Sequence, residues 1–178
     1  MKIELIDRPN LTEEEEKLRK LWTSKPYYQK TFYINDKPIT VPNEIFKAYE
    51  FKGICLVHFI SDSVEGAKKR GYDGSRNIWA FDQDGNKVWE VEHPVESIAK
   101  ERIVQGKQTV EEDFDQNGNF IRTFIDSNGE IREKYDTYTS FNIGKQQYEG
   151  KVFVGTFNGF TGELNIETGQ VTNWLQGR

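Results

Sequence analysis

Hydrophobic and polar positions alternate over most of this chain, and a period of two is the pattern of strands with one buried face. The clearest example is the stretch 77–92, in which two aromatic and β-branched runs flank a polar turn at 82–85. Asp is favoured at the first position of a type I turn and Gly at the fourth, as at Asp82 and Gly85. The stretch therefore predicts a β-hairpin, which we expect at the centre of the core.

Two registers of this hairpin are compatible with the sequence. If Gly85 adopts a left-handed conformation, the turn is type I with a bulge and Asp82 faces Asn86. The residues that then share one face are Trp79, Phe81, Trp89 and Val91. A two-residue turn at 84–85 would instead group Ile78, Ala80, Trp89 and Val91. The pattern does not choose between them, but in both we expect the tryptophans to pack in the core.

Strand patterns also precede this hairpin. Residues 31–41 predict a hairpin whose second strand begins at Pro38, at a sheet edge. Residues 3–6 predict a short edge strand, and residues 45–50 fit either a short strand or a turn of helix. The run 53–60 is the most apolar in the chain, which predicts a strand buried on both faces.

Strand patterns follow the hairpin as well. The Asp-x-x-Gly turn recurs at 115–118 and 126–129, with one expected strand at 119–125. The portion 151–174 predicts two or three more strands, broken at 158–159 and 168–169. Stretch 95–110 receives no assignment.

One helix is expected, at about 12–23, where Thr12 and Glu15 form a capping box ahead of a thin apolar stripe. Residues 61–76 are polar, glycine-rich and without periodicity, which predicts a long loop. The chain is therefore expected to form a single mainly-β domain over 1–178. It is an antiparallel meander of about eight to ten strands in blade-like hairpins over 29–175, with the N-terminal helix packed on it.

Composition supports a folded domain. Only 35% of the 178 residues are apolar, but 24 residues are aromatic and they are spread along the chain. Aromatic side chains bury large areas and favour strands. The net charge of −5 argues against a nucleic-acid partner. Cys55 is the single cysteine, no apolar run could span a membrane, and the first residues lack a signal-peptide pattern, which together predict a soluble, cytoplasmic protein.

Candidate chemistry is sparse, and no cofactor site is expected. Asp113, Asp115 and Asn117 match the first half of an EF-hand calcium loop, but Phe124 stands where a bidentate Glu is needed, which favours an ordinary turn. His58 is expected in the core and His93 at an exposed strand end. Strand geometry separates Cys55 and His58 onto opposite faces, which argues against a nucleophile–base pair.

Two segments resemble the blade repeats of quinoprotein-type β-propellers, in which an Ala-x-Asp-x-x-x-Gly-like turn joins two strands and the second ends in Trp. They are the segment 80–89, with a turn one residue shorter, and the segment 164–174, with Asn165 in place of Asp. The chain is too short for four blades of about forty residues. The resemblance implies blade-like sheet structure, and no cofactor or dehydrogenase residue is carried over.

These features favour a non-catalytic bacterial binding protein that recognises another protein, with toxin-neutralising immunity proteins as one class. Its acidic charge would speed association with a basic partner. The rival is a small enzyme or ligand-binding domain with a pocket in the curved sheet; a third interpretation is a module that oligomerises through an exposed edge strand. The partner-binding residues are expected in the 61–76 loop: Asp62, Glu65, Lys68, Lys69, Arg70, Tyr72 and Asp73. Further candidates for a binding surface are the aromatic residues Tyr27, Tyr28, Tyr135 and Tyr138, for which packing at the edge of an aromatic core is the favoured interpretation.

Overall fold

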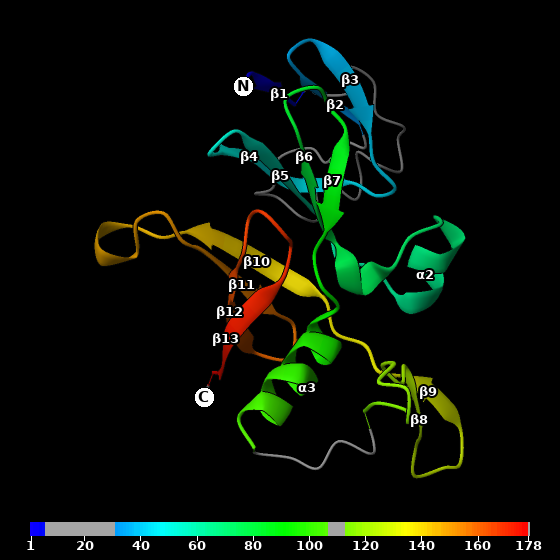
Figure 1. Cartoon of the computed structure of the whole chain (residues 1–178). Coiled ribbons are helices and arrows are strands. Elements are labelled where there is room, and N and C mark those ends of the chain that lie inside the picture. Colours follow the sequence, from blue (N-terminus) through cyan, green and yellow to red (C-terminus); the bar gives the residue numbers. More distant parts are fainter. Residues whose placement is uncertain (6–30, 107–112, 178) are drawn as a thin grey trace.

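The computed structural model describes residues 1–5, 31–106 and 113–177 and is built mainly from β-strands (Figure 1). In chain order the elements are β1 (Ile3–Glu4), β2 (Thr31–Ile34), β3 (Lys37–Thr40), β4 (Ile45–Phe51), β5 (Ile54–Phe59), α2 (Val64–Lys69), η1 (Gly74–Arg76), β6 (Ile78–Phe81), β7 (Lys87–Glu90), α3 (Pro94–Val104), β8 (Thr123–Ile125), β9 (Ile131–Glu133), β10 (Tyr138–Ile143), η2 (Gln146–Tyr148), β11 (Val152–Thr156), β12 (Phe160–Leu164) and β13 (Val171–Gln176). The helix predicted at 12–23 lies outside the described residues, as do Tyr27 and Tyr28.

All paired strands in the described ranges are antiparallel and follow one another in sequence order within four sheets: β1–β2–β3, β4–β5–β6–β7, β8–β9 and β10–β11–β12–β13. The predicted mainly-β antiparallel meander is confirmed. It has thirteen strands in the described part of the chain, where eight to ten were expected. Strands β9 and β10 add to the number, because they lie between residues 130 and 150, for which no strand range was given.

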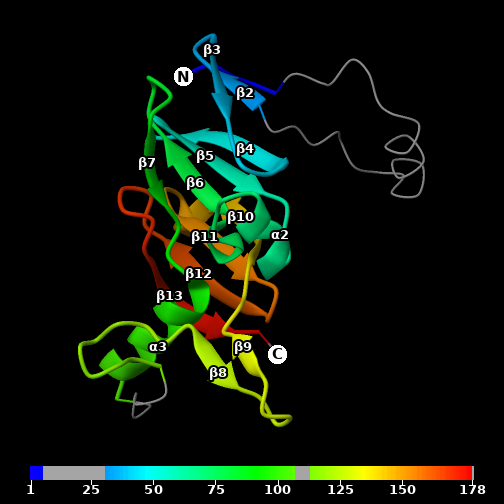
Figure 2. The same cartoon turned by 90° about the vertical axis from the view of Figure 1, so that its right-hand side faces the viewer.

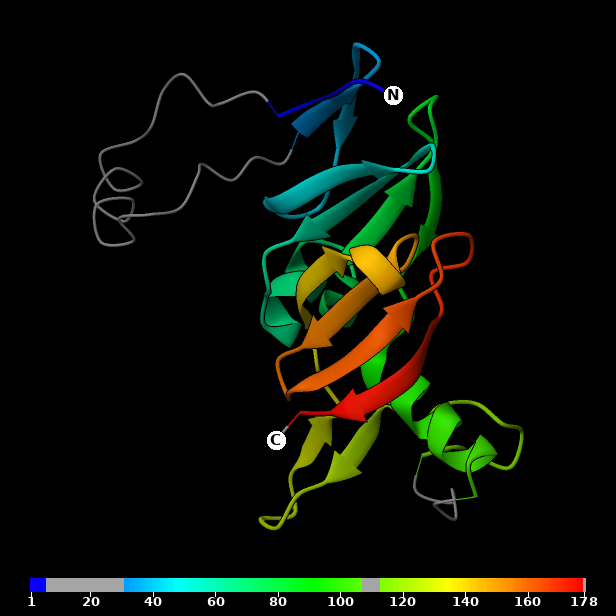
Figure 3. The ribbon, with the colours of Figure 1, turned by 90° about the vertical axis from the view of Figure 1, so that its left-hand side faces the viewer.

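Three of the sheets stack, with β4–β7 in the middle (Figures 2 and 3). One apolar cluster fills the space between β4–β7 and β10–β13, and a second lies between β4–β7 and β1–β3. Strand β5 contributes side chains to both apolar clusters. Leu56 belongs to the first cluster, and Cys55, Val57 and Phe59 belong to the second. The prediction that this strand is buried on both faces is confirmed.

Asn77, fully buried before β6, connects two of the stacked sheets. Its Nδ2 donates to the carbonyl oxygens of Phe59 (3.2 Å) and Tyr138 (2.8 Å), and its Oδ1 accepts from the Tyr138 amide (3.1 Å). A backbone group buried between sheets needs such a partner, since leaving it unpaired is costly. Asn77 thereby fixes the start of β10 against the end of β5.

The Asn77→Ala variant is expected to lose about 1–3 kcal/mol of unfolding free energy, because the buried Tyr138 amide is left without an acceptor. Urea denaturation of the variant and the wild type measures the difference. Asn142→Ala, at an exposed position of β10, is the control and should stay within about 0.5 kcal/mol of wild type. Equal stability of the two variants would contradict the bridging role of Asn77.

The central hairpin combines the turn of one predicted register with the facing residues of the other. Gly85 has φ +77° and the Asp82 amide donates to the Asn86 carbonyl (3.0 Å), as in the type I turn with a bulge. A register shift then pairs Ala80 with Trp89 and Phe81 with Lys87. The extra residue, Val88, is 49% exposed.

Because of this shift, the two tryptophans face different layers. Ile78, Ala80, Trp89 and Val91 pack toward β10–β13, whereas Trp79 and Phe81 pack toward β1–β3. Both tryptophans pack against protein, as expected: the Trp79 indole N–H donates to the Arg76 carbonyl and that of Trp89 to the Ile166 carbonyl.

The Asp-x-x-Gly turns share one construction. In each, an oxygen of the Asp carboxylate accepts from the amides two and four residues later, as Asp82 Oδ1 does from Asp84 (2.9 Å) and Asn86 (2.8 Å). Asp115 and Asp126 repeat this arrangement. The pKa of all three carboxyl groups lies below the usual value, lowered most by the Asn86 amide at Asp82, by the Asn119 side chain at Asp115 and by the Arg132 side chain at Asp126. The other amide hydrogen bonds of each turn add to this effect.

The prediction of a long loop over 61–76 is wrong, because this segment contains α2 and η1. Ser63 caps α2 by accepting from the Gly66 amide (3.0 Å), and Asp73 caps η1 by accepting from the Ser75 amide. A six-residue helix with Ala67 as its single buried residue cannot show a helical period of apolar residues.

The prediction of a single strand over 119–125 is also wrong. Only β8 is a strand there, preceded by an isolated bridge between Phe114 and Phe120.

One surface assignment, that of His93, is wrong as well. His93 is 1% exposed, because it immediately precedes α3 and its ring packs on Phe120 (5.3 Å between centroids). Tyr138 packs in the core, as was favoured over exposure: it is fully buried, stacks on Trp174 and donates its hydroxyl hydrogen to the Glu92 carbonyl (2.8 Å). The sequence neighbours of His93 gave no sign of its burial.

Candidate recognition surface

A cavity of about 310 Å³ lies between α2, the η1 turn and the base of the β8–β9 hairpin. Its lining residues are Val64, Lys68, Tyr72, Asp73, Gly74, Arg122, Glu133 and Tyr135. Figures 2 and 3 show the hairpin projecting at the end of the molecule opposite β1–β3. The cavity therefore lies where the protruding β8–β9 hairpin meets α2 and η1. It does not lie inside the curved sheet.

Ion pairs across the cavity fix the hairpin to the body. Arg122 Nη2 lies 2.6 Å from Asp73 Oδ2, and Lys68 Nζ pairs with Glu133 Oε1. Burial by itself raises the pKa of Asp73, but hydrogen bonds from Arg122 and the Ser75 amide outweigh it and leave the pKa below the usual value. The four charges are thus paired with each other.

Tyrosine hydroxyls complete the joint. The Tyr135 hydroxyl donates to the Asp62 carbonyl, and the Tyr72 hydroxyl accepts from Asn43 Nδ2 (3.0 Å). Burial raises the pKa of Tyr72 to about 12, so this hydroxyl stays protonated at neutral pH. Each contact joins α2 or its flanks to a segment distant in sequence.

The residues predicted as a partner-binding loop are divided by this geometry. Lys68, Tyr72 and Asp73 line the cavity. Asp62 and Arg70 form an ion pair with each other beside α2. Glu65 and Lys69 are exposed on α2 and do not line the cavity.

The predicted partner-binding residues did not include the other side chains that line the cavity, which are those of Val64, Arg122, Glu133 and Tyr135. Tyr135 alone carried a signal, as an aromatic residue in a polar neighbourhood. Arg122 and Glu133 reach the cavity through pairings with residues 49 and 65 positions away. No local pattern encodes such pairings.

The β8–β9 hairpin carries exposed apolar side chains. Ile125 and Ile131 are paired across the hairpin and are 72% and 75% exposed, and Phe124 on the other face is 46% exposed. Side chains directly opposite each other in an antiparallel pair share one face. We call the face formed by Ile125 and Ile131 the isoleucine face. It is a local apolar surface held at a fixed position by the ion pairs at its base.

His93 lies behind the cavity. Neither ring nitrogen has a hydrogen-bond partner in the described ranges, and the same is true of the buried Ser75 Oγ. Burial lowers the pKa of His93 to about 4, although the nearby Asp73 carboxylate opposes this. The imidazole is therefore neutral at pH 7, and it contributes packing to the junction of η1, α3 and Phe120.

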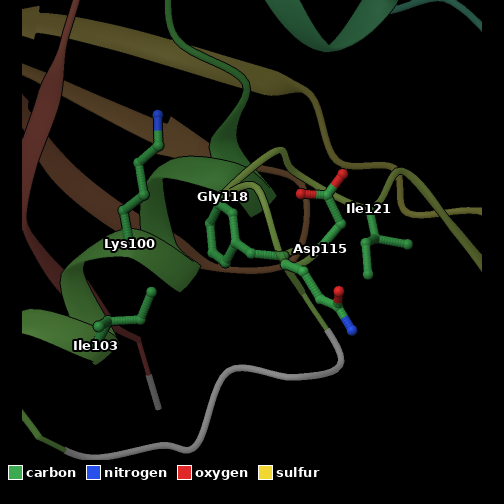
Figure 4. Close-up of a pocket in the computed structure, with 7 residues that line it drawn as sticks. Lys100, Ile103, Asp115, Gly118 and Ile121 are labelled. Carbon is green, nitrogen blue, oxygen red and sulfur yellow. The ribbon is translucent and has the colours of Figure 1, made fainter.

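A second hollow of about 960 Å³ separates α3 from the 113–121 segment, lined by Lys100, Ile103, Phe114, Asp115, Gln116, Gly118 and Ile121 (Figure 4). The Lys100 ammonium points away from Asp115 and pairs with Glu92 and Glu96. Asp115 is engaged in its own turn, and Asp113 pairs with Lys134 (2.8 Å). The turn geometry accounts for the calcium-like pattern, and no metal-ligating group of three appears among the described residues.

The histidine proposed for a rival enzyme lies in the core. His58 is 2% exposed, its Nε2 bonds to the Tyr138 carbonyl (2.9 Å), and Phe46 and Phe141 flank its ring. Cys55 belongs to the opposite apolar cluster, so the two side chains lie on opposite faces of β5, as predicted. Burial raises the pKa of the Cys55 thiol to about 12.

Comparison with known proteins gives one match. Residues 23–110 match a family model described as a domain of unknown function, DUF7957. The match covers just under half of the chain and ends after α3, so it omits β8–β13, including half of the core between the stacked sheets. No curated protein and no solved structure matches the chain. Neither α2 nor α3 is long and apolar enough to cross a membrane.

Proposed function

We propose that this protein is a non-catalytic, cytoplasmic binding protein that recognises another protein through the isoleucine face of the β8–β9 hairpin. The observation that carries the proposal is the pair Ile125 and Ile131, about three-quarters exposed on a protruding hairpin. Large apolar side chains gathered on a surface mark interaction sites, and they supply the buried centre of an interface.

The anchoring of the hairpin supports the same function. The pairs Arg122–Asp73 and Lys68–Glu133 and the bond from Tyr135 to Asp62 hold its base against α2. A surface that is already ordered loses less entropy on binding and therefore binds more tightly. The same internal pairing favours recognition over the rival ligand-binding function, since the cavity's charged groups already have partners.

The charge of the chain indicates the class of partner. At −5 it would attract a basic protein and accelerate the encounter at low salt. A basic toxin, such as a nuclease, neutralised by a bacterial immunity-type protein is the partner class that fits this charge and the small size of the chain. Binding of such a partner should weaken as salt is added.

The test is affinity capture at low salt with the wild type and with a double variant, Ile125→Ser and Ile131→Ser. We expect the wild type to retain one stoichiometric basic protein and the double variant to retain at least about tenfold less, since two buried apolar anchors are lost. The control is Phe157→Ser with Leu175→Ser, which removes side chains of similar exposure (77% and 72%) away from the hairpin. Absence of any stoichiometric partner, or equal loss in the control, would overturn the proposal.

A further inference from the structure

Among residues 1–5, 31–106 and 113–177, none pairs as a strand with the outer edge of β8. The Lys134 amide donates to the Arg122 carbonyl and the Asp126 amide to the Glu130 carbonyl, so residues 122, 124 and 126 direct their backbone groups toward β9. Hydrogen-bonding direction alternates along an antiparallel strand, and Thr123 and Ile125 therefore direct theirs outward.

The open edge lacks the protection that edge strands normally carry. Charged side chains, proline and bulges usually prevent an edge from pairing with other chains. Strand β8 consists of Thr123, Phe124 and Ile125, all exposed and none charged. Strand β9, which forms the other edge of the hairpin, carries Arg132 and Glu133.

The sequence of this edge is complementary to itself. When 122–126 pairs antiparallel with a second copy about a two-fold axis at Phe124, Arg122 faces Asp126 of the second copy and Thr123 faces its Ile125. Arg122 keeps its ion pair with Asp73 and Asp126 its ion pair with Arg132 inside each copy, so groups of opposite sign, and not like charges, face each other at both ends. The two phenylalanines meet in the centre. The equivalent pairing of β9 would place Arg132 against Arg132, a like-charge contact that destabilises a sheet.

The hairpin geometry also defines the length of this pairing. The Ile121 amide donates to the Asp113 carbonyl (2.8 Å), so that outward position is already used. The pairing is therefore confined to 122–126. In it, Thr123 and Ile125 exchange backbone hydrogen bonds with Ile125 and Thr123 of the second copy.

We propose that two copies of this chain associate through β8 and form a continuous sheet in the order β9–β8–β8–β9. Directly paired side chains of an antiparallel sheet lie on the same face. The isoleucine faces of the two copies therefore adjoin on one side of this sheet, which doubles the apolar area. The pairing uses the strand edge and does not depend on the proposed recognition of another protein.

Sedimentation equilibrium of the wild-type chain over a range of concentrations tests the association. We expect a reversible monomer–dimer equilibrium between 20.8 kDa and twice that mass. Because a five-residue pairing makes a small interface, the dimer should belong to the weak, transient class. A wild type that stays monomeric up to its solubility limit overturns the proposal, even if it binds a second protein through β8.

The variant Phe124→Glu separates the edge contact from the hairpin itself. Within one copy the new carboxylate lies opposite Arg132, which preserves the hairpin, but across the two-fold axis two carboxylates face each other. We expect at least a tenfold weaker dimer. Phe157→Glu, at another exposed phenylalanine, is the control and should dimerise as the wild type does. Equal dimerisation of Phe124→Glu and the wild type contradicts the β8 interface.

Disulfide capture tests the register. In a non-hydrogen-bonded antiparallel pair the Cα atoms lie about 4.5 Å apart, within the range that a disulfide can bridge. Phe124→Cys should therefore form a covalent dimer under mild oxidation, whereas Arg132→Cys on β9 should not. The native Cys55 is buried and should leave the wild type uncrosslinked. Equal crosslinking of the two variants would show random collision and overturn the register.

Failure here and failure of the proposed function give different results. If the dimer is absent but Ile125→Ser with Ile131→Ser still abolishes capture of a basic protein, the proposed function stands and this inference falls. If Phe124→Glu abolishes the dimer while the wild type captures no partner, the β8 dimer stands and the proposed recognition function fails.

Discussion

Replacing Gly169 by alanine is expected to lower the unfolding free energy by about 2–5 kcal/mol, whereas Gly159→Ala should cost about 1–2 kcal/mol. Both glycines have a left-handed backbone, with φ +77° and +83°. They differ in their surroundings. A Cβ at Gly169 would lie 2.7 Å from Trp89 Cε3 and 2.9 Å from the Glu90 carbonyl oxygen, while a Cβ at Gly159 would have no heavy atom within 4 Å.

The contact at Gly169 joins the two stacked sheets. Trp89 of β7 packs on the turn between β12 and β13, where its indole N–H donates to the Ile166 carbonyl (2.9 Å). The Glu92 amide donates to the Gly169 carbonyl (2.9 Å) beside it. A methyl group in this space must displace the indole or the β7 backbone, and both displacements open the core between the sheets.

Urea denaturation of the wild type and the two alanine variants measures the effect. Because the conformational strain is common to both, the difference between the variants isolates the packing of Trp89 against the turn. That difference should be about 1–3 kcal/mol. Similar losses in the two variants would show that the tryptophan can move aside without cost, and would reduce Gly169 to an ordinary turn glycine.

Local patterns were sufficient for most strands. The period of two and the Asp-x-x-Gly turns depend on neighbouring residues, so they located the hairpins around Gly85 and Gly129 and the breaks at Gly159 and Gly169. The register of the central hairpin could not be predicted from local sequence, because the bulge at Val88 depends on packing against the sheets on either side.

Helix α3 shows why a helix can lack a signal. One of its buried residues is Ser97, whose hydroxyl donates to the Val171 carbonyl (2.8 Å) and accepts from the Trp174 indole (2.9 Å). A polar residue on the buried face interrupts the apolar stripe that sequence analysis depends on. Its partners lie more than seventy residues away, beyond the reach of a local pattern.

The candidate surface was located only in part for the same reason. Lys68, Tyr72 and Asp73 were predicted from a polar segment, and that segment proved to be helical. The hairpin beside the cavity was expected as an ordinary meander strand. Ile125 and Ile131 are exposed because no layer formed by the described part of the chain covers them, which only the fold reveals.

The free energy of unfolding is expected to fall by up to about 6 kcal/mol as the pH is lowered from 7.5 to 4, because two histidines are buried in the neutral form. Burial lowers the pKa of both His58 and His93 to about 4. In the unfolded chain each titrates near 6.5. Between these pH values the unfolded state binds more protons than the folded state, so stability decreases as pH falls.

The surroundings of the two rings explain why neither can charge readily. His58 has Lys47 as its nearby charge, which further disfavours the imidazolium, and its hydrogen bond to the Tyr138 carbonyl opposes the shift only in part. His93 lies near Asp73, Glu96, Arg76 and Arg122, whose opposing charges largely offset one another. Asp73, with its lowered pKa, contributes stability above its usual pKa that is lost below it, in a separate and more acidic range.

Urea denaturation at intervals from pH 8 to pH 4 measures this dependence, and phenylalanine variants assign it. His58→Phe and His93→Phe keep a ring of similar size but cannot titrate, so each should remove about 3 kcal/mol of the pH-dependent loss. The variants are compared by the slope of stability against pH, which a change in packing alone leaves unaltered. A wild type whose stability is flat between pH 7 and 4.5 would show that the rings reach water, and would contradict the closed junction of η1, α3 and Phe120 around His93.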